Sequence, residues 1–235
     1  MQPNHYLPPA SLVPYIAFYS ILESEEKMPE LLVSPPLGLC GIIIFLEGEP
    51  TPMLNGKPFM KQQWCATGQI TQPMIVPPPQ VPLKEVLVFM HPCGLYQLFG
   101  IDMQLLTNTS LPLTDLLGDE DCNKLINVLK TAASHEEIIE TLNNFFIKQL
   151  PVFEIAPAVK KAIDYIHNNK GNISIKELEK TCFTTTRSLE RHFKKYIGLS
   201  PNEYAKIYRF KCLINYINEH PNVSWEVLCS ENGDY

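Results

Sequence analysis

The uneven distribution of proline sets the strongest limit on how this chain can fold. Sixteen of its 21 prolines lie within the first 92 residues. Proline has no backbone N–H, and its ring clashes with the preceding helical turn, so long helices are excluded from most of this region. We therefore expect short strands and turns in the first part of the chain and helices in the remainder.

Short apolar segments within the proline-rich region are the candidate strands. The longest apolar run, Leu39–Leu46, has eight residues, which suits a buried strand and falls short of the ~18 needed to span a bilayer. The residues before it lack a basic region and an apolar signal core, so neither export nor a membrane partner is expected. The candidate strands are Tyr15–Leu22, Leu39–Leu46, Met74–Val76 and Glu85–Met90, with a loop at Pro77–Pro79.

Helical periodicity begins near Asp119. Apolar residues recur through Asn123–Ala132, and Ser134 followed by Glu137 forms a capping box that opens a second helix. That helix carries a wide apolar stripe over residues 138–150 and is expected to end at Pro151. Residues 151–156 are a plausible boundary between residues 1–150 and 157–235, and Pro157–Asn168 is the next helix.

The segment from Ile173 to Arg209 predicts a helix-turn-helix. Ser174 and Glu177 form a capping box, and the turn at residues 183–185 ends in threonines that suit an N-cap. Gly198 stops the second helix, and Ser200-Pro201 starts a third. Two short helices joined by about four residues, the second basic at its start, match the helix-turn-helix pattern.

Local charge supports a nucleic-acid partner. Residues 152–220 hold 12 Lys/Arg and 7 Asp/Glu, so 12 − 7 = +5, whereas residues 1–151 hold 7 and 15, so 7 − 15 = −8. Attraction to phosphate depends on this local charge and not on the net charge of −6.

The sequence TRSLERHFKKYIGLSPNEYAKIYRFK resembles the core signature of AraC/XylS-type transcription regulators, including Gly-Leu-Ser-Pro and a long helix with Tyr204 and Arg209. The match runs from about Pro157 to the end. Upstream, GIIIFLEG, TGQITQP and HPCGLYQLFGI resemble the N-terminal domain of one branch of these regulators. The resemblance implies a cytoplasmic regulator that binds double-stranded DNA and responds to a small-molecule effector.

Two further expectations come from this resemblance. A helical pair in the N-terminal domain often mediates dimerisation in such regulators, so residues 138–150 form either a homodimer contact or a stripe packed on their own domain. The family's DNA-binding domain has two helix-turn-helix units bridged by a long helix. Residues 201–219 supply the bridge, and residues 224–235 look like the start of a second unit whose recognition helix is cut short.

The expected base readers lie on the second helix of the motif. Arg187 can pair with guanine O6 and N7, and Arg191 can do the same or hold a phosphate. Glu190 can accept a hydrogen bond from cytosine N4 or orient an arginine; we favour the second role.

The expected phosphate contacts flank these residues. Thr185 and Thr186, at the helix N-terminus, can donate hydrogen bonds to phosphate with help from the helix dipole. Lys194 would add sequence-independent attraction.

No cofactor or metal site is expected from the remaining residues. The seven cysteines are scattered, which indicates reduced thiols, and His91 with Cys93 is the only close His–Cys pair. Four large side chains either line a ligand cavity or, as we favour, pack in the core: Phe45, Trp64, Phe89 and Met90.

The predicted fold is α+β: a mostly β N-terminal domain of cupin-like type with a helical pair, then an all-α helix-turn-helix domain. The predicted function is sequence-specific transcription regulation and not enzymatic. The alternatives are an enzyme or a cysteine-based DNA-alkyl acceptor fused to the same DNA-binding domain. The acceptor would need an exposed, activated cysteine beside basic or histidine partners.

Overall fold

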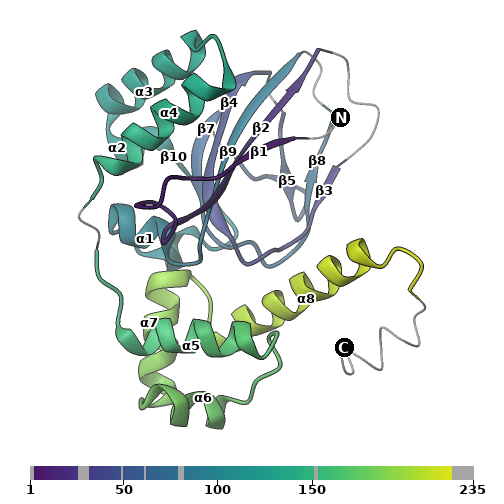
Figure 1. Cartoon of the computed structure of the whole chain (residues 1–235), viewed down its shortest axis with the longest axis vertical. Coiled ribbons are helices and arrows are strands. Elements are labelled where there is room, and N and C mark those ends of the chain that lie inside the picture. Colours follow the sequence, from purple (N-terminus) through teal and green to yellow (C-terminus); the bar gives the residue numbers. More distant parts are fainter. Residues whose placement is uncertain are drawn as a thin grey trace.

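The computed structural model describes residues 3–25, 32–48, 50–60, 62–78, 82–150 and 153–223. A β-rich N-terminal domain precedes a helical C-terminal region, which confirms the predicted α+β class (Figure 1). The expected second helix-turn-helix unit at residues 224–235 lies outside the described residues.

The larger sheet has six antiparallel strands in the order β1-β2-β9-β4-β7-β10. Central strands β2, β4 and β9 correspond to predicted strands, each within two residues at both ends. The strands are β1 (Asn4–Tyr6), β2 (Ile16–Ser24), β9 (Leu83–Met90), β4 (Cys40–Glu47), β7 (Trp64–Thr67) and β10 (Ser110–Pro112).

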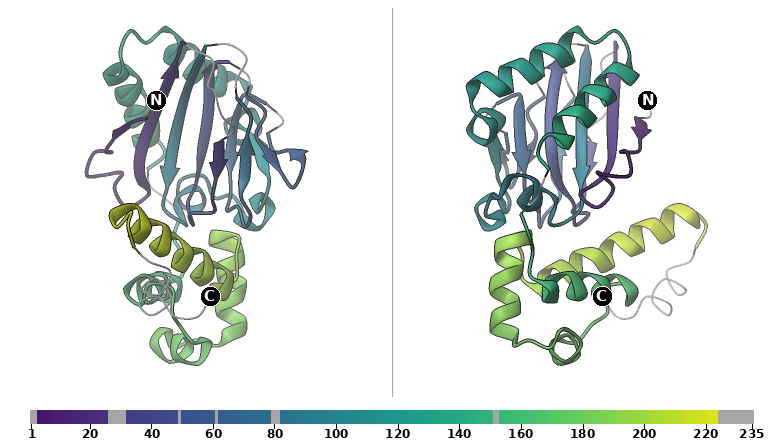
Figure 2. Two further views of the ribbon diagram at one scale, coloured as in Figure 1. Left: turned by 90° about the vertical axis from the view of Figure 1, so that its right-hand side faces the viewer. Right: turned by 60° about the vertical axis from the view of Figure 1, so that its left-hand side comes forward.

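One face of this sheet is covered by helices. Ile42 pairs with Val88 and Ile44 with Val86, and all four side chains are buried. The Tyr19 hydroxyl on β2 donates a 2.8 Å hydrogen bond to Oδ1 of Asn143. The helices that cover the face are α3 (Asp119–Thr131) and α4 (His135–Ile147), as Figure 2 shows.

A smaller sheet completes the β-rich domain, with strand order β3-β8-β5-β6. Its buried side chains, Leu54, Phe59 and Met74, form a separate small core. The predicted strand Met74–Val76 is β8; Pro79 of the predicted loop lies outside the described residues. The other strands are β3 (Leu32–Ser34), β5 (Met53–Leu54) and β6 (Lys57–Pro58).

The predicted helical pair forms, with one difference at its end. Helix α4 starts at the Ser134 cap, whose hydroxyl accepts from the Glu137 N–H at 3.3 Å, but it ends at Ile147 and not at Leu150. Pro151, expected to end it, lies outside the described residues. Three further short helices precede the pair: α1 (Gly94–Phe99), the 3-10 helix η1 (Met103–Leu106) and α2 (Leu113–Leu117).

Residues 153–223 of the C-terminal region form four helices whose predicted ends are confirmed. The structure has α5 (Pro157–Asn168), α6 (Ile175–Cys182), α7 (Thr186–Ile197) and α8 (Pro201–Glu219). Ser200 and Glu203 form a full capping box at the start of α8. Proline at the first helical position begins α5 and α8, and the left-handed Gly198 follows the last residue of α7.

The two parts of the chain are packed together and share one continuous buried cluster. Helix α7 lies against η1, and α8 runs below the strands (Figure 1). The Thr107 hydroxyl donates a 2.7 Å hydrogen bond to the Gly198 carbonyl oxygen. The division into domains at 1–150 and 157–235 therefore stays a prediction, because the contact between the parts is extensive.

Candidate nucleic-acid interface

Helices α6 and α7 form the predicted helix-turn-helix. The turn is closed by Phe183, in the left-handed region at φ 51°, whose N–H donates to the Glu179 carbonyl oxygen. Thr185 is the N-cap of α7, and its hydroxyl oxygen accepts from the Ser188 N–H at 3.3 Å. The threonine cap predicted from sequence is confirmed.

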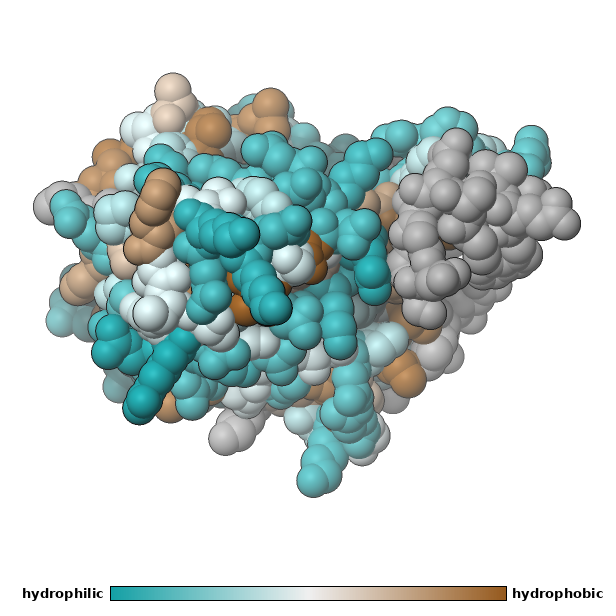
Figure 3. Space-filling view, turned by 90° about the horizontal axis from the view of Figure 1, so that it is seen from below, coloured by the Kyte–Doolittle hydropathy of each residue, from teal (hydrophilic) through white to brown (hydrophobic). Residues whose placement is uncertain are grey.

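The two faces of α7 differ sharply. Leu189, Phe193 and Ile197 are buried against the other helices. Arg187, Glu190 and Arg191 are exposed on the opposite side. Residues three and four apart lie on one helix face, so these side chains form a single exposed row. From the side of the helical region, the visible surface is largely hydrophilic (Figure 3).

The exposed row borders a shallow hollow of about 590 Å³. The structure brings four of the six predicted DNA contacts around it, together with three residues from neighbouring elements. The residues that line it are Arg187, Glu190, Arg191, Lys194, Gln104, Ser200 and Glu203. Gln104 comes from η1 in the N-terminal domain, and no local sequence signal placed it here.

Thr186 is held in internal hydrogen bonds. Its N–H donates to Oε1 of Glu179 at 2.6 Å, and its hydroxyl donates to the same oxygen. These bonds lower the pKa of the Glu179 carboxyl. A carboxylate therefore already occupies the N-terminus of α7, where the sequence predicted a phosphate. Thr185 uses its hydroxyl oxygen in the cap, as the acceptor from the Ser188 N–H.

Lys194 is also paired. Its Nζ lies 2.9 Å from Oε2 of Glu203, which also accepts a 2.8 Å hydrogen bond from the Ser200 N–H. Partial burial opposes ionisation of Glu203, but the contacts with Lys194 and Ser200 outweigh it and lower its pKa to about 2. Nothing in the sequence identified Glu203 as the partner of Lys194.

The far end of α7 contacts the N-terminal domain. The rings of Tyr96 and Tyr196 lie 4.5 Å apart between centroids, and Lys195 Nζ lies 5.6 Å from the Tyr96 ring. Gly198 has φ 93°, and a Cβ atom there would lie 2.6 Å from Oγ1 of Thr107. This interface therefore joins the candidate recognition helix directly to α1 and η1.

The described cysteines do not fit an alkyl acceptor. Cys40, Cys65, Cys93, Cys122 and Cys182 are buried. Burial raises the pKa of each of these thiols, and that of the half-buried Cys212, so the thiolate is disfavoured. Cys229 lies outside the described residues.

Within the described ranges, no three His, Cys, Asp or Glu side chains lie close enough together to hold a metal ion. None of the described helices is long and apolar enough to cross a membrane.

The four large side chains considered for a ligand cavity mainly pack within the protein. Phe45 and Met90 are buried in the core, as favoured, and Phe89 stacks on Phe18 at 4.6 Å between centroids. Trp64 is half-buried, and its Nε1 donates to the Phe45 carbonyl oxygen at 3.1 Å.

The stripe of α4 packs inward. Ile138, Leu142 and Phe146 are buried in their own domain, which leaves them unavailable to a second copy. A homodimer contact through 138–150 stays a prediction that now rests on the partly exposed Phe145 and Ile147.

Comparisons with known proteins give these likenesses. A family described as a domain of unknown function (DUF6597) matches residues 4–112. No curated protein matches. An apo ToxT variant from Vibrio cholerae strain SCE256 aligns with TM-score 0.49 and 10% identity, over 92% of this chain and 88% of that one. ToxT from Vibrio cholerae O395 aligns with TM-score 0.47 and 9% identity, over 92% of this chain and 87% of that one. The AraC-like transcriptional activator CuxR aligns with TM-score 0.29 and 15% identity, over 92% of this chain and 94% of that one.

Proposed function

We propose that this chain is a sequence-specific DNA-binding transcription regulator of the AraC/XylS type, acting in the cytoplasm, whose N-terminal domain responds to a small molecule. The observation that carries the proposal is the exposed row of Arg187, Glu190 and Arg191 on the second helix of a helix-turn-helix. It is supported by the positive charge of residues 152–220 in an acidic chain.

The row has the chemistry of base readout. Arg187 and Arg191 are one helical turn apart, so their guanidinium groups can reach neighbouring base pairs in the major groove. A guanidinium donates two parallel hydrogen bonds to guanine O6 and N7. Glu190 lies between them and either orients an arginine or accepts from cytosine N4. Thr185 supplies a phosphate contact at the helix N-terminus.

Regulation would act through the packed interface at the end of α7. Tyr96, Thr107 and Gly198 join the recognition helix to the N-terminal domain. An effector that binds one arrangement of this interface better than another would change the affinity of the chain for DNA. DNA would change the affinity for the effector by the same factor.

The test is to select bound duplexes from random DNA and then compare variants on the selected site. Arg187→Ala is expected to cost about 1–3 kcal/mol on that site and to relax preference at one or two base pairs. Lys57→Ala, which removes one positive charge from the N-terminal domain, is the control and is expected to change little. Equal weakening of selected and random DNA by Arg187→Ala would exclude a base-reading role.

A further inference from the structure

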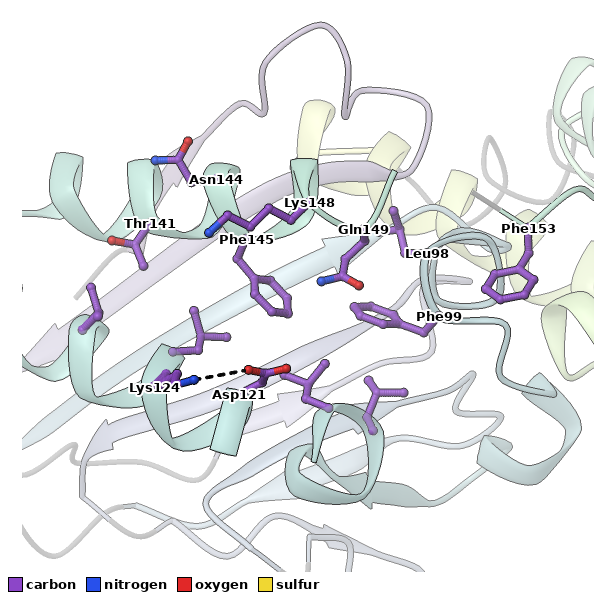
Figure 4. A pocket seen from close by; sticks show the side chains of 14 residues that line it. Leu98, Phe99, Asp121, Lys124, Thr141, Asn144, Phe145, Lys148, Gln149 and Phe153 are labelled. Atoms are coloured by element: carbon purple, nitrogen blue, oxygen red, sulfur yellow. Dashed lines mark ion pairs between the residues drawn. The ribbon is translucent and has the colours of Figure 1, made fainter. Parts of the chain in front are cut away.

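A second concave site lies on the N-terminal domain, away from the helix-turn-helix. It is a groove of about 720 Å³ between α3 and α4, closed at one end by α1 and α2 (Figure 4). Pockets for small ligands span roughly 300–1,000 Å³, so the size suits one. Its apolar lining comprises Leu98, Phe99, Leu116, Leu117, Leu125, Val128, Phe145 and Phe153.

The floor of the groove is aromatic and partly open to solvent. Phe99 and Phe145 are stacked with their ring centroids 6.5 Å apart, and both project into the groove in Figure 4. Val128 is 52% exposed on the α3 side, and Phe153 is 51% exposed beyond α1. Clustered apolar exposure of this kind indicates a binding surface, and a flat aromatic ligand would cover it.

The rim of the groove leaves one cation unpaired. Lys124 is already paired with Glu120 and lies 4.0 Å from Asp121. Lys148 has no ion pair within the described part of the chain, and in Figure 4 its side chain extends along α4 above Phe145. The amide of Gln149 lies on the other side of Phe145, above Phe99, and so apart from the ammonium group of Lys148. A carboxylate bound on this side of Phe145 would meet the ammonium group of Lys148.

We propose that this groove binds a small aromatic carboxylate, with its ring system on Phe99 and Phe145 and its acid group at Lys148. The groove is thus the effector site of the proposed regulator, and this regulatory role rests on that proposed function.

Helix α1 connects the groove to the recognition helix. Leu98 and Phe99 line the groove, whereas Tyr96 of the same six-residue helix contacts Tyr196 and Lys195 of α7. The segment that leads into α5 also takes part, because the Phe153 N–H donates to the Gln97 carbonyl oxygen at 2.7 Å. A ligand on Phe99 would therefore touch the helix that carries both of these contacts with the C-terminal region.

Binding is tested by calorimetry on the full chain without DNA, using three probes that share one ring system: naphthoate, naphthalenemethanol and naphthalenemethylamine. Naphthoate is expected to bind best. Lys148→Gln should weaken naphthoate a few-fold and leave the alcohol unchanged, because it removes only the charge contact. Val128→Trp fills the groove and should weaken both at least about tenfold.

Leu7→Trp is the matched control for Val128→Trp, because Leu7 is 81% exposed and lies outside the groove. Thermal unfolding of each variant confirms that it is folded. Equal affinity for the three probes, or unchanged binding by Val128→Trp, overturns the site. Self-association of the wild type that Val128→Trp abolishes, measured by light scattering, would show instead that a second copy covers the groove.

The regulatory role is tested with the selected DNA. Naphthoate should change DNA affinity, and DNA should change naphthoate affinity by the same factor. Binding in the groove without such a change would overturn the effector role alone. Failure of the Arg187→Ala test would instead contradict the proposed base readout. Failure of the effector role and failure of the DNA-binding function are therefore distinguishable.

Discussion

At the scale of the residue, Phe183 is the most unusual position in the helix-turn-helix. It has φ 51°, and its side chain is 87% exposed. A bulky L-residue in the left-handed region costs roughly 1–2 kcal/mol, because Cβ approaches the following carbonyl oxygen. A contact with Lys161 Nζ, 5.4 Å from the ring, offsets part of this cost. Phe183 is an exposed ring in a strained turn beside α7, which suggests that the ring contacts a binding partner and does not serve the fold.

Phe183→Asn tests this position. Asparagine tolerates the left-handed region, so the variant should be more stable by about 0.5–1 kcal/mol, measured by denaturant unfolding. If the ring packs against the DNA backbone, the same variant should bind DNA less tightly while being more stable. Reduced stability would show that the Lys161 contact outweighs the backbone strain.

At the scale of the element, helix ends were predictable and helix neighbours were not. Ser174, Thr185 and Ser200 cap their helices as their sequence context predicts, because capping depends on residues within one turn. The approach of η1 to α7 has no such local signal. It depends on Thr107 and Gly198, which are 91 residues apart in sequence, and so Gln104 was missed as part of the hollow. The short strands β5, β6 and β7 were missed for the same reason: pairing across the sheet defines them.

Glu203→Gln separates the two roles of the residue that links α7 to α8. Glutamine can still accept the hydrogen bond from the Ser200 N–H, so the capping box and thermal stability should be largely kept. Lys194 loses its ion pair and becomes available to a phosphate. Non-specific DNA affinity should rise, and the slope of log affinity against log salt should steepen by about 0.9. An unchanged slope would mean that Lys194 does not reach the phosphates.

At the scale of the whole molecule, a half-buried polar contact between α5 and α8 lies next to the junction with the N-terminal domain. His167 Nε2 on α5 lies 2.8 Å from the Tyr204 hydroxyl on α8, and its ring stacks on Tyr208 at 4.1 Å between centroids. Desolvation, together with the charge of Lys211, lowers the pKa of His167 from 6.5 to about 4. Tyr204 in turn lies against Gly38 of the N-terminal domain. The neutral imidazole is therefore part of the packing between the two parts of the chain.

The stability of the folded chain should consequently fall as the pH is lowered from about 6.5 to 4. The unfolded chain binds a proton at His167 near pH 6.5, whereas the folded chain binds it only near pH 4. The contribution of His167 to the free energy of unfolding is constant above about pH 6.5. It is lost progressively as pH falls towards 4, and it changes no further below pH 4. Thermal unfolding of His167→Gln across this range should show a flatter profile than the wild type, with His5→Gln as the control. Parallel profiles for wild type and His167→Gln would assign the acid sensitivity to other groups.

The close approach at Gly198 has a consequence for how the protein would switch. The Thr107 hydroxyl, the Gly198 carbonyl oxygen and the Met103 backbone meet where no Cβ atom fits. Tightly packed contacts of this kind do not stretch gradually; they are either made or broken. If α7 is the recognition helix that we propose, we expect it to move between discrete positions separated by a barrier. DNA occupancy would then change through the fraction of molecules in each position and not through a graded drift of the helix.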